Sequence, residues 1–111
     1  MILRSFGYTY TFSPNEQILE KVGNGLREII KAQSGVAYQS ERAAELYPTT
    51  GSTDDWYTET GGMWGWTIEL RDRGVYGFQL PASQIIQTGE EMWAAMKYYS
   101  AEIIKNGPVA N

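Results

Sequence analysis

The sequence predicts an α/β fold with few strands and two main helices. Two long segments, ending near residues 34 and 106, place apolar side chains at helical spacing. Between them, residues 63–70 alternate apolar with smaller or polar side chains, as a strand with one buried face does. Each helix must bury its apolar stripe against another element, and this order of elements favours helices layered on a sheet.

The N-terminal part predicts a strand followed by a helix. Ile2 and Leu3 are expected to form a short strand that runs into a turn. The helix should begin near residue 13, because Ser13 can cap it, Pro14 suits the first helical position and Glu16 completes a capping box. Its end is predicted where serine is followed by glycine, at residues 34–35. The apolar stripe comprises Ile18, Leu19, Val22, Leu26, Ile29 and Ile30.

The middle of the chain gives weaker signals. Residues 36–46 show no clear period. Residues 47–62 are rich in Pro, Thr, Gly, Ser and Asp, which predicts a loop. A loop of that length is often functional.

Residues 63–70 predict a strand with two different faces. The apolar face carries Trp64, Trp66, Ile68 and Leu70, and the other face carries Gly65, Thr67, Glu69 and Arg71. A charged turn at residues 71–74 follows, and then a short aromatic stretch that Pro81 ends.

The last predicted helix starts at Thr88, where Glu91 completes a second capping box. Residues 106–108, Asn-Gly-Pro, give its stop signal. Its apolar positions are Met92, Met96, Tyr99 and Ile103.

Composition excludes several classes of function. The net charge of −4 gives no electrostatic basis for binding nucleic acid or an anionic membrane surface. No apolar run is long enough to span a bilayer, and no apolar leader segment follows Met1. The chain has neither cysteine nor histidine, so a zinc site built from its residues alone would need carboxylates only, which is unusual.

Three groups of residues are candidates for chemistry, and each has an ordinary structural alternative. Glu69 ends an apolar strand, where it is either a tuned general base or the ion-pair partner of Arg71. Asp54 and Asp55 either bind a cation or metal, or bond their own backbone in Asx turns. An aromatic cluster forms either a sugar- or peptide-binding surface or part of the core; it comprises Trp56, Tyr57, Trp64, Trp66, Tyr76 and Phe78.

Three motifs resemble one known family. The segment from Glu69 to Ile86 begins Glu-Leu-Arg-Asp-Arg-Gly-Val-Tyr-Gly-Phe-Gln-Leu-Pro, which resembles the most recognisable stretch of the zinc carboxypeptidases of the pancreatic A/B type. Residues 47–56, Tyr-x-x-x-Gly-x-x-x-Asp-Trp, resemble the substrate loop of that family, at the family's spacing from the glutamate. Residues 6–9, Phe-Gly-Tyr-Thr, also resemble the family. The similarity covers nearly the whole chain.

The resemblance implies a fold and roles for individual residues. It implies the C-terminal portion of a three-layer fold with a mixed sheet. Glu69 matches the catalytic glutamate that activates the zinc-bound water and carries its proton to the leaving amine. Tyr47 matches the mobile tyrosine that closes over the substrate, Phe78 matches an aromatic residue of the cleft, and Thr67 matches a position in the pocket for the C-terminal side chain.

Asp54 matches the position that separates specificities in the family. Members that prefer apolar C-terminal residues carry an aliphatic residue there, and members that prefer Lys or Arg carry Asp. The resemblance therefore implies a preference for basic or mixed C-terminal residues of peptide or protein substrates, because an unpaired buried carboxylate is costly.

The family's zinc ligands, a His-x-x-Glu motif and a later histidine, match nothing in this sequence. Residues 1–111 are therefore expected to be the C-terminal part of a catalytic domain, inactive alone, with the missing N-terminal half as its partner. The hypotheses that remain beside it are a non-catalytic peptide-binding module and a carbohydrate-binding module. Members of the family are mostly secreted, which the resemblance extends to this chain as an expectation.

Overall fold

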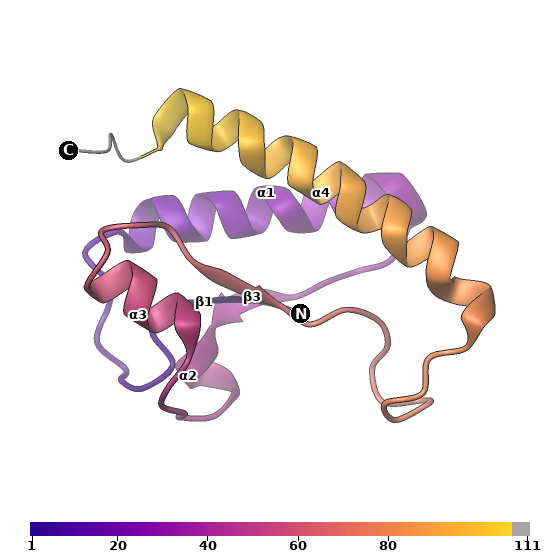
Figure 1. The fold of residues 1–111 in the computed structure, drawn as a ribbon, viewed down its shortest axis with the longest axis horizontal. Coiled ribbons are helices and arrows are strands. Elements are labelled where there is room, and N and C mark those ends of the chain that lie inside the picture. Colours follow the sequence, from indigo (N-terminus) through magenta and orange to yellow (C-terminus); the bar gives the residue numbers. More distant parts are fainter. Residues whose placement is uncertain (108–111) are drawn as a thin grey trace.

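The computed structural model of the chain describes residues 1–107. The predicted α/β class, with few strands and two main helices, is confirmed (Figure 1). The elements are β1 (Ile2–Arg4), α1 (Glu16–Ser34), β2 (Ser40–Arg42), α2 (Ala43–Leu46), α3 (Thr53–Glu59), β3 (Trp66–Ile68), a 3₁₀ turn (Ala82–Gln84) and α4 (Ile85–Asn106).

The three strands form one mixed sheet in the order β2-β1-β3. β1 lies in the middle and pairs parallel with β2, so that Ile2 is opposite Ser40. On its other side β1 pairs antiparallel with β3, where Leu3 is opposite Thr67. Within residues 1–107, the outer side of β3 is therefore an open edge of the sheet.

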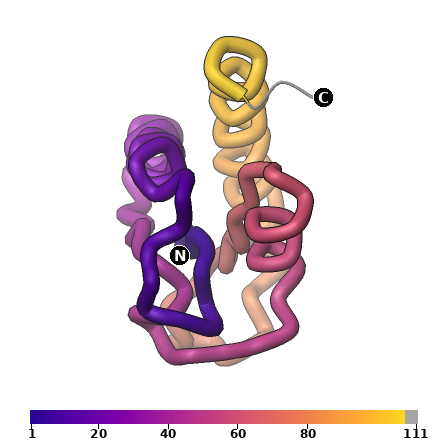
Figure 2. Tube along the Cα trace, turned by 90° about the vertical axis from the view of Figure 1, so that its left-hand side faces the viewer, coloured from indigo at the N-terminus to yellow at the C-terminus, as the bar shows by residue number. Residues whose placement is uncertain are grey.

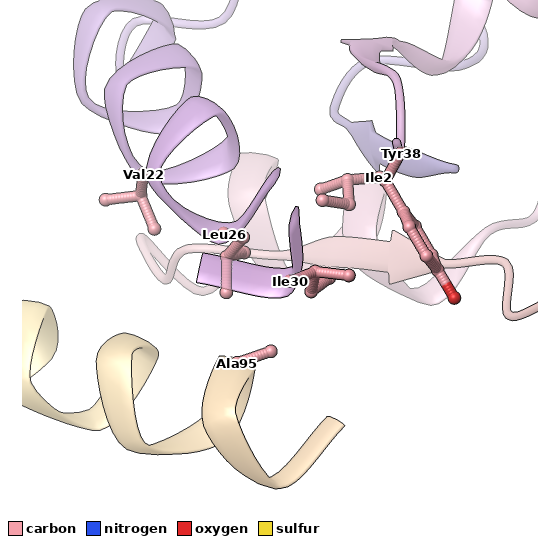
Figure 3. Close-up of a cluster of buried hydrophobic side chains, with 6 residues drawn as sticks. All are labelled: Ile2, Val22, Leu26, Ile30, Tyr38 and Ala95. Carbon is pink, nitrogen blue, oxygen red and sulfur yellow. The ribbon is translucent and has the colours of Figure 1, made fainter. Parts of the chain in front are cut away.

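The two long helices build the core with the sheet. α1 packs on β1 and β2, and α4 runs along α1, as the two views in Figures 1 and 2 show. The cluster between them draws on the central strand, both helices and the segment before β2 (Figure 3); it comprises Ile2, Val22, Leu26, Ile30, Tyr38 and Ala95. Each large aliphatic side chain buried there stabilises the fold by about 1.5–3 kcal/mol.

The predicted capping box at the start of α1 is wrong. Ser13 Oγ accepts a hydrogen bond from the Asn15 backbone N–H at 3.1 Å, and the helix begins only at Glu16. Glu16 does not reach back to the cap, because its carboxylate receives the buried Arg4 guanidinium at 2.8 Å. The predicted end is right: Gly35 follows the helix with φ +77°, a conformation that glycine adopts without steric cost.

Residues 47–62 are not one loop, because α3 lies within them. Ser52 precedes this helix in an extended conformation, and Asp54 and Asp55 occupy its first turn. Carboxylates stabilise a helix at this end, where the backbone N–H groups point outward. The Asp-Asp pair was thus a helix-start signal that the turn-rich composition of the surrounding residues obscured.

The predicted strand at residues 63–70 is shorter than expected, since β3 spans only Trp66–Ile68. Its two faces are as predicted: Trp66 and Ile68 pack against the core, whereas Thr67 and Glu69 are exposed. Leu70 was expected on the buried face and is exposed instead, because the chain has left the sheet by then.

The aromatic cluster divides into two parts. Core packing is the correct interpretation for Trp64 and Trp66, which pack beside Tyr99 of α4. It is wrong for the other four members, which are exposed: Trp56, Tyr57, Tyr76 and Phe78.

α4 begins earlier than predicted, at Ile85. Thr88 does not cap it: its hydroxyl donates to the Gln84 carbonyl at 2.8 Å, one turn back within the helix. The predicted end at Asn106 is confirmed, and Pro108, the last residue of the predicted stop, lies outside the described residues.

Candidate active site

Glu69 stands where the sheet ladder ends. Its backbone N–H donates to the Met1 carbonyl at 2.8 Å, and the Met1 amino group donates to the Glu69 carbonyl at 2.6 Å. Its side chain is exposed and borders a cavity of about 900 Å³ that Tyr38, Arg71 and Arg73 also line. These two bonds hold the backbone of Glu69 at the end of the sheet, while its side chain extends into solvent.

The predicted ion pair between Glu69 and Arg71 is wrong. Arg71 turns to α4 and binds the carboxylate of Glu91, through Nε to both oxygens at 3.1 Å and through a further bond from Nη2. Ser34 and Tyr38 also donate to this carboxylate, the tyrosine at 3.4 Å. Glu69 is thus left without the structural partner that the ordinary interpretation gave it.

Charge and burial shift the pKa values of this group of side chains. Burial raises the pKa of Glu91, but the hydrogen bonds from Arg71 and Ser34 outweigh it and lower the pKa below its usual value. Burial and the neighbouring Glu91 charge raise the pKa of Tyr38 to about 12. At neutral pH the group therefore consists of a carboxylate, a guanidinium and a neutral phenol.

Asp54 lies in the first turn of α3 with 6% of its surface exposed. It lines a second cavity, of about 300 Å³, together with Thr67, Trp64 and Tyr99. Its Oδ2 is buried and has no hydrogen-bond partner among residues 1–107. Burying a carboxylate oxygen unpaired is unfavourable, so this atom is suited to a cation that the described residues do not supply.

Asp55 does not form the predicted Asx turn within its own loop. Both of its oxygens accept the Gly7 backbone N–H, at 3.0 and 2.9 Å, and one also accepts that of Tyr8 at 3.2 Å. The carboxylate thereby fixes the segment after β1 against α3. No local pattern could have indicated a partner so far away in the sequence.

The structure brings only some of the predicted site residues together. Asp54 and Thr67 line the smaller cavity, and Glu69 borders the larger one. Tyr47 follows α2 and is 60% exposed, Phe78 is fully exposed, and neither lines either cavity.

The described residues contain no metal site and no membrane span. No group of three or more Asp or Glu side chains in residues 1–107 is placed to hold a metal ion, and the sequence contains no His or Cys. Among the helices of the same part of the chain, none is both long and apolar enough to cross a bilayer.

Comparison with known proteins identifies the family. The model of the zinc carboxypeptidase family matches residues 1–95. This chain belongs to the zinc carboxypeptidase family. It is 38% identical over 98 residues to carboxypeptidase A4 of Mus musculus and 35% identical over 107 residues to carboxypeptidase B of Bos taurus. These alignments cover 87% and 96% of the chain but only 23% and 26% of the two relatives.

Solved structures give the same result for the fold of this zinc carboxypeptidase chain. Bovine thrombin-activatable fibrinolysis inhibitor, solved in complex with a tick carboxypeptidase inhibitor, superposes with a TM-score of 0.90 at 30% identity. The match covers 95% of this chain and 36% of that one. The chain thus has the carboxypeptidase fold, and it spans about a quarter of the length of the curated relatives that it matches.

Proposed function

We propose that residues 1–111 form the C-terminal part of a carboxypeptidase catalytic domain, which hydrolyses the C-terminal peptide bond of peptides and proteins. The observation that carries the proposal is the position of Glu69. Its carboxylate is exposed directly after β3, beside the larger cavity, and Arg71 is bound to Glu91. A carboxylate held in this way has its oxygens available for proton transfer.

Glu69 acts in two steps. It first accepts a proton from the attacking water as a general base, and it then donates that proton to the amine that leaves as the peptide bond breaks. Zinc held by residues outside the described part of the chain would acidify this water and polarise the carbonyl group. Residues 1–107 do not fit a zinc site, so the metal ligands lie outside them and the chain is inactive by itself.

The smaller cavity binds the side chain of the C-terminal residue. Asp54 and Thr67 both line it, and the unpaired Oδ2 of Asp54 favours the cationic side chain of Lys or Arg. Tyr47 closes over the substrate and Phe78 lines the cleft. Both are exposed in residues 1–107, which supports contact with groups outside this part of the chain.

The partner of the chain is the zinc-binding N-terminal part of the same kind of domain. The open edge of β3 supports this, because an unpaired strand edge offers backbone donors and acceptors to a further strand. A secreted location, as expected from the family, is also part of this proposal.

The test uses the chain and an extended form, in which its upstream coding sequence, or the N-terminal part of bovine carboxypeptidase B, precedes residue 1. Zinc stoichiometry and release of the C-terminal residue from a blocked dipeptide are measured on both. We expect zinc and activity only in the extended form. There, Glu69→Gln should abolish activity and leave the zinc in place. An active Glu69→Gln variant, or an extended form that binds zinc without hydrolysing peptides, contradicts the proposal.

The specificity is tested separately. Asp54→Asn in the extended form should lower kcat/KM for a dipeptide ending in Arg by about ten- to a hundredfold, because an ion pair with a buried carboxylate is lost. Hydrolysis of the same dipeptide ending in Phe is the internal control and should change little. Equal losses on both substrates would rule out Asp54 as a specificity residue.

A second candidate function rests on Trp56 and Tyr57. Both are exposed, and their rings meet edge to face with centroids 5.2 Å apart, an arrangement open to a sugar ring. A carbohydrate-binding module should bind glycans on an array, lose that binding on Trp56→Ala and keep it on Glu69→Gln. Binding that survives Trp56→Ala and is lost on Glu69→Gln would favour the carboxypeptidase or a non-catalytic module for peptide C-termini.

A further inference from the structure

Glu91 is the only carboxylate among the described residues with no exposed surface. It lies on α4, and its oxygens accept hydrogen bonds from three other parts of the chain. The donors are Ser34 at the end of α1, Tyr38 before β2, and Arg71 after β3. A buried carboxylate with so many donors is fully satisfied, and it fixes the geometry of the elements that donate to it.

Arg71 is the donor that matters for the site, because it comes two residues after Glu69. Its guanidinium is bound on both sides: Nε and Nη2 hold Glu91, and Nη1 donates to the side-chain oxygens of Gln84 and Gln87, each at 3.2 Å. Only 10% of the Arg71 side-chain surface is exposed. The planar guanidinium group therefore has little freedom to turn or shift.

Glu69 lies between two fixed points. On its N-terminal side the sheet ladder reaches Glu69 itself, through the bonds with Met1. On its C-terminal side the first strongly held side chain is Arg71, since Leu70 between them is 48% exposed. The Glu69 side chain has no hydrogen bond within residues 1–107, so its position depends on the backbone that these two anchors hold.

We propose that Arg71 and Glu91 are positioning residues for Glu69, and that the buried Arg71–Glu91 pair holds the carboxylate of Glu69 at its working position from outside the reaction centre. This inference rests on the proposed function. Neither residue donates or accepts the transferred proton, because the hydrogen bonds described above already occupy the donors of Arg71 and the oxygens of Glu91. Its effect is on the rate of the chemical step, where a displacement of 1 Å lowers rates by about a hundredfold.

The first test measures kcat and KM of the extended form. Glu91→Gln keeps the size of the side chain but removes its charge, and kcat should fall by about a hundredfold. KM should stay within about threefold, and zinc content should not change, because substrate and metal are bound by other residues. The matched control is Glu102→Gln on the same helix, which removes an ion pair with Lys21 of 3.8 Å and should leave kcat within about twofold.

Arg71→Lys provides a second variant in case Glu91→Gln does not fold. It keeps the positive charge and loses the planar arrangement of donors, so kcat should fall by about tenfold or more with KM again nearly constant. An unchanged kcat in the variants that fold overturns the proposal. A loss that appears in KM alone also overturns it, because a misplaced proton-transfer group does not act on substrate affinity.

A second measurement separates this inference from the proposed function. The ¹⁵N order parameter of the Leu70 amide, which lies past the last ladder bond and directly before Arg71, should be near 0.85 in the parent and fall toward about 0.6 in Glu91→Gln, but not in Glu102→Gln. If the zinc-loaded parent is inactive, the proposed function fails. In that case an unchanged order parameter in Glu91→Gln would overturn the positioning role as well. If the parent is active and the variants keep its kcat and its order parameter, only the positioning role is overturned.

Discussion

Asp54 and Asp55 are adjacent carboxylates for which the structure predicts different changes in stability on the same substitution. Both are buried in the first turn of α3, with 6% and 5% of their surface exposed. Asp55 accepts two backbone N–H groups, those of Gly7 and Tyr8, whereas Asp54 Oδ2 has no partner among the described residues. Asp55→Asn should therefore destabilise the fold, and Asp54→Asn should not.

The expected magnitudes follow from these contacts. In Asp55→Asn one oxygen becomes an NH₂ group that faces backbone donors, so at least one charge-assisted hydrogen bond is lost, at about 1.5–3 kcal/mol. In Asp54→Asn no hydrogen bond of Oδ2 is lost and an unpaired buried charge is removed, so we expect a change of less than about 1 kcal/mol in either direction. The favourable interaction with the N-terminus of α3 is similar for both residues and cancels in the comparison.

The assay is urea denaturation of the extended form at pH 7, followed by tryptophan fluorescence. A free energy of unfolding that is lower for Asp55→Asn than for Asp54→Asn by about 2 kcal/mol would agree with the hydrogen-bond count. Equal losses, or a larger loss in Asp54→Asn, would refute the reasoning, because Asp54 would then have a structural partner. Combined with the substrate test above, a stable Asp54→Asn variant that loses activity toward Arg substrates would assign Asp54 to function.

Four further outcomes can be checked. Because the outer edge of β3 is unpaired among residues 1–107, the 111-residue chain alone should associate or unfold without cooperativity, and a monomer with a sharp unfolding transition would contradict this. The folded state keeps the Tyr38 proton that the unfolded chain releases above pH 10, so stability should decline between about pH 10 and 12, and Tyr38→Phe should make that decline shallower. The lowered pKa of Glu91 gives stability that is present above pH 4.5 and lost on further acidification, and Glu91→Gln should flatten this acid limb. In Gly25→Ala the new methyl group would overlap the Tyr98 hydroxyl, which should cost about 1–3 kcal/mol in thermal unfolding.

Local patterns predicted the elements that depend on local physics. The helix α1 and its end at Gly35 follow from apolar spacing and from the conformational freedom of glycine. The two faces of β3 follow from the alternation of side chains, which puts Thr67 and Glu69 on one side. Helix α3 was missed because the residues around it favour turns, although Asp54 and Asp55 carry a start signal.

By itself, the sequence determined the kinds of side chain available for chemistry. Without histidine or cysteine, the chain could contribute carboxylates and hydroxyl groups but neither of the two commonest zinc-binding side chains, and the role of Glu69 as the reactive group stays a prediction from its motifs. Only the tertiary structure decided which charges meet. Arg71 binds Glu91 on another element, and Asp55 binds the backbone of Gly7. The physical reason is that a charged side chain has several possible partners along the sequence, and packing of the core selects the one that shares its buried position.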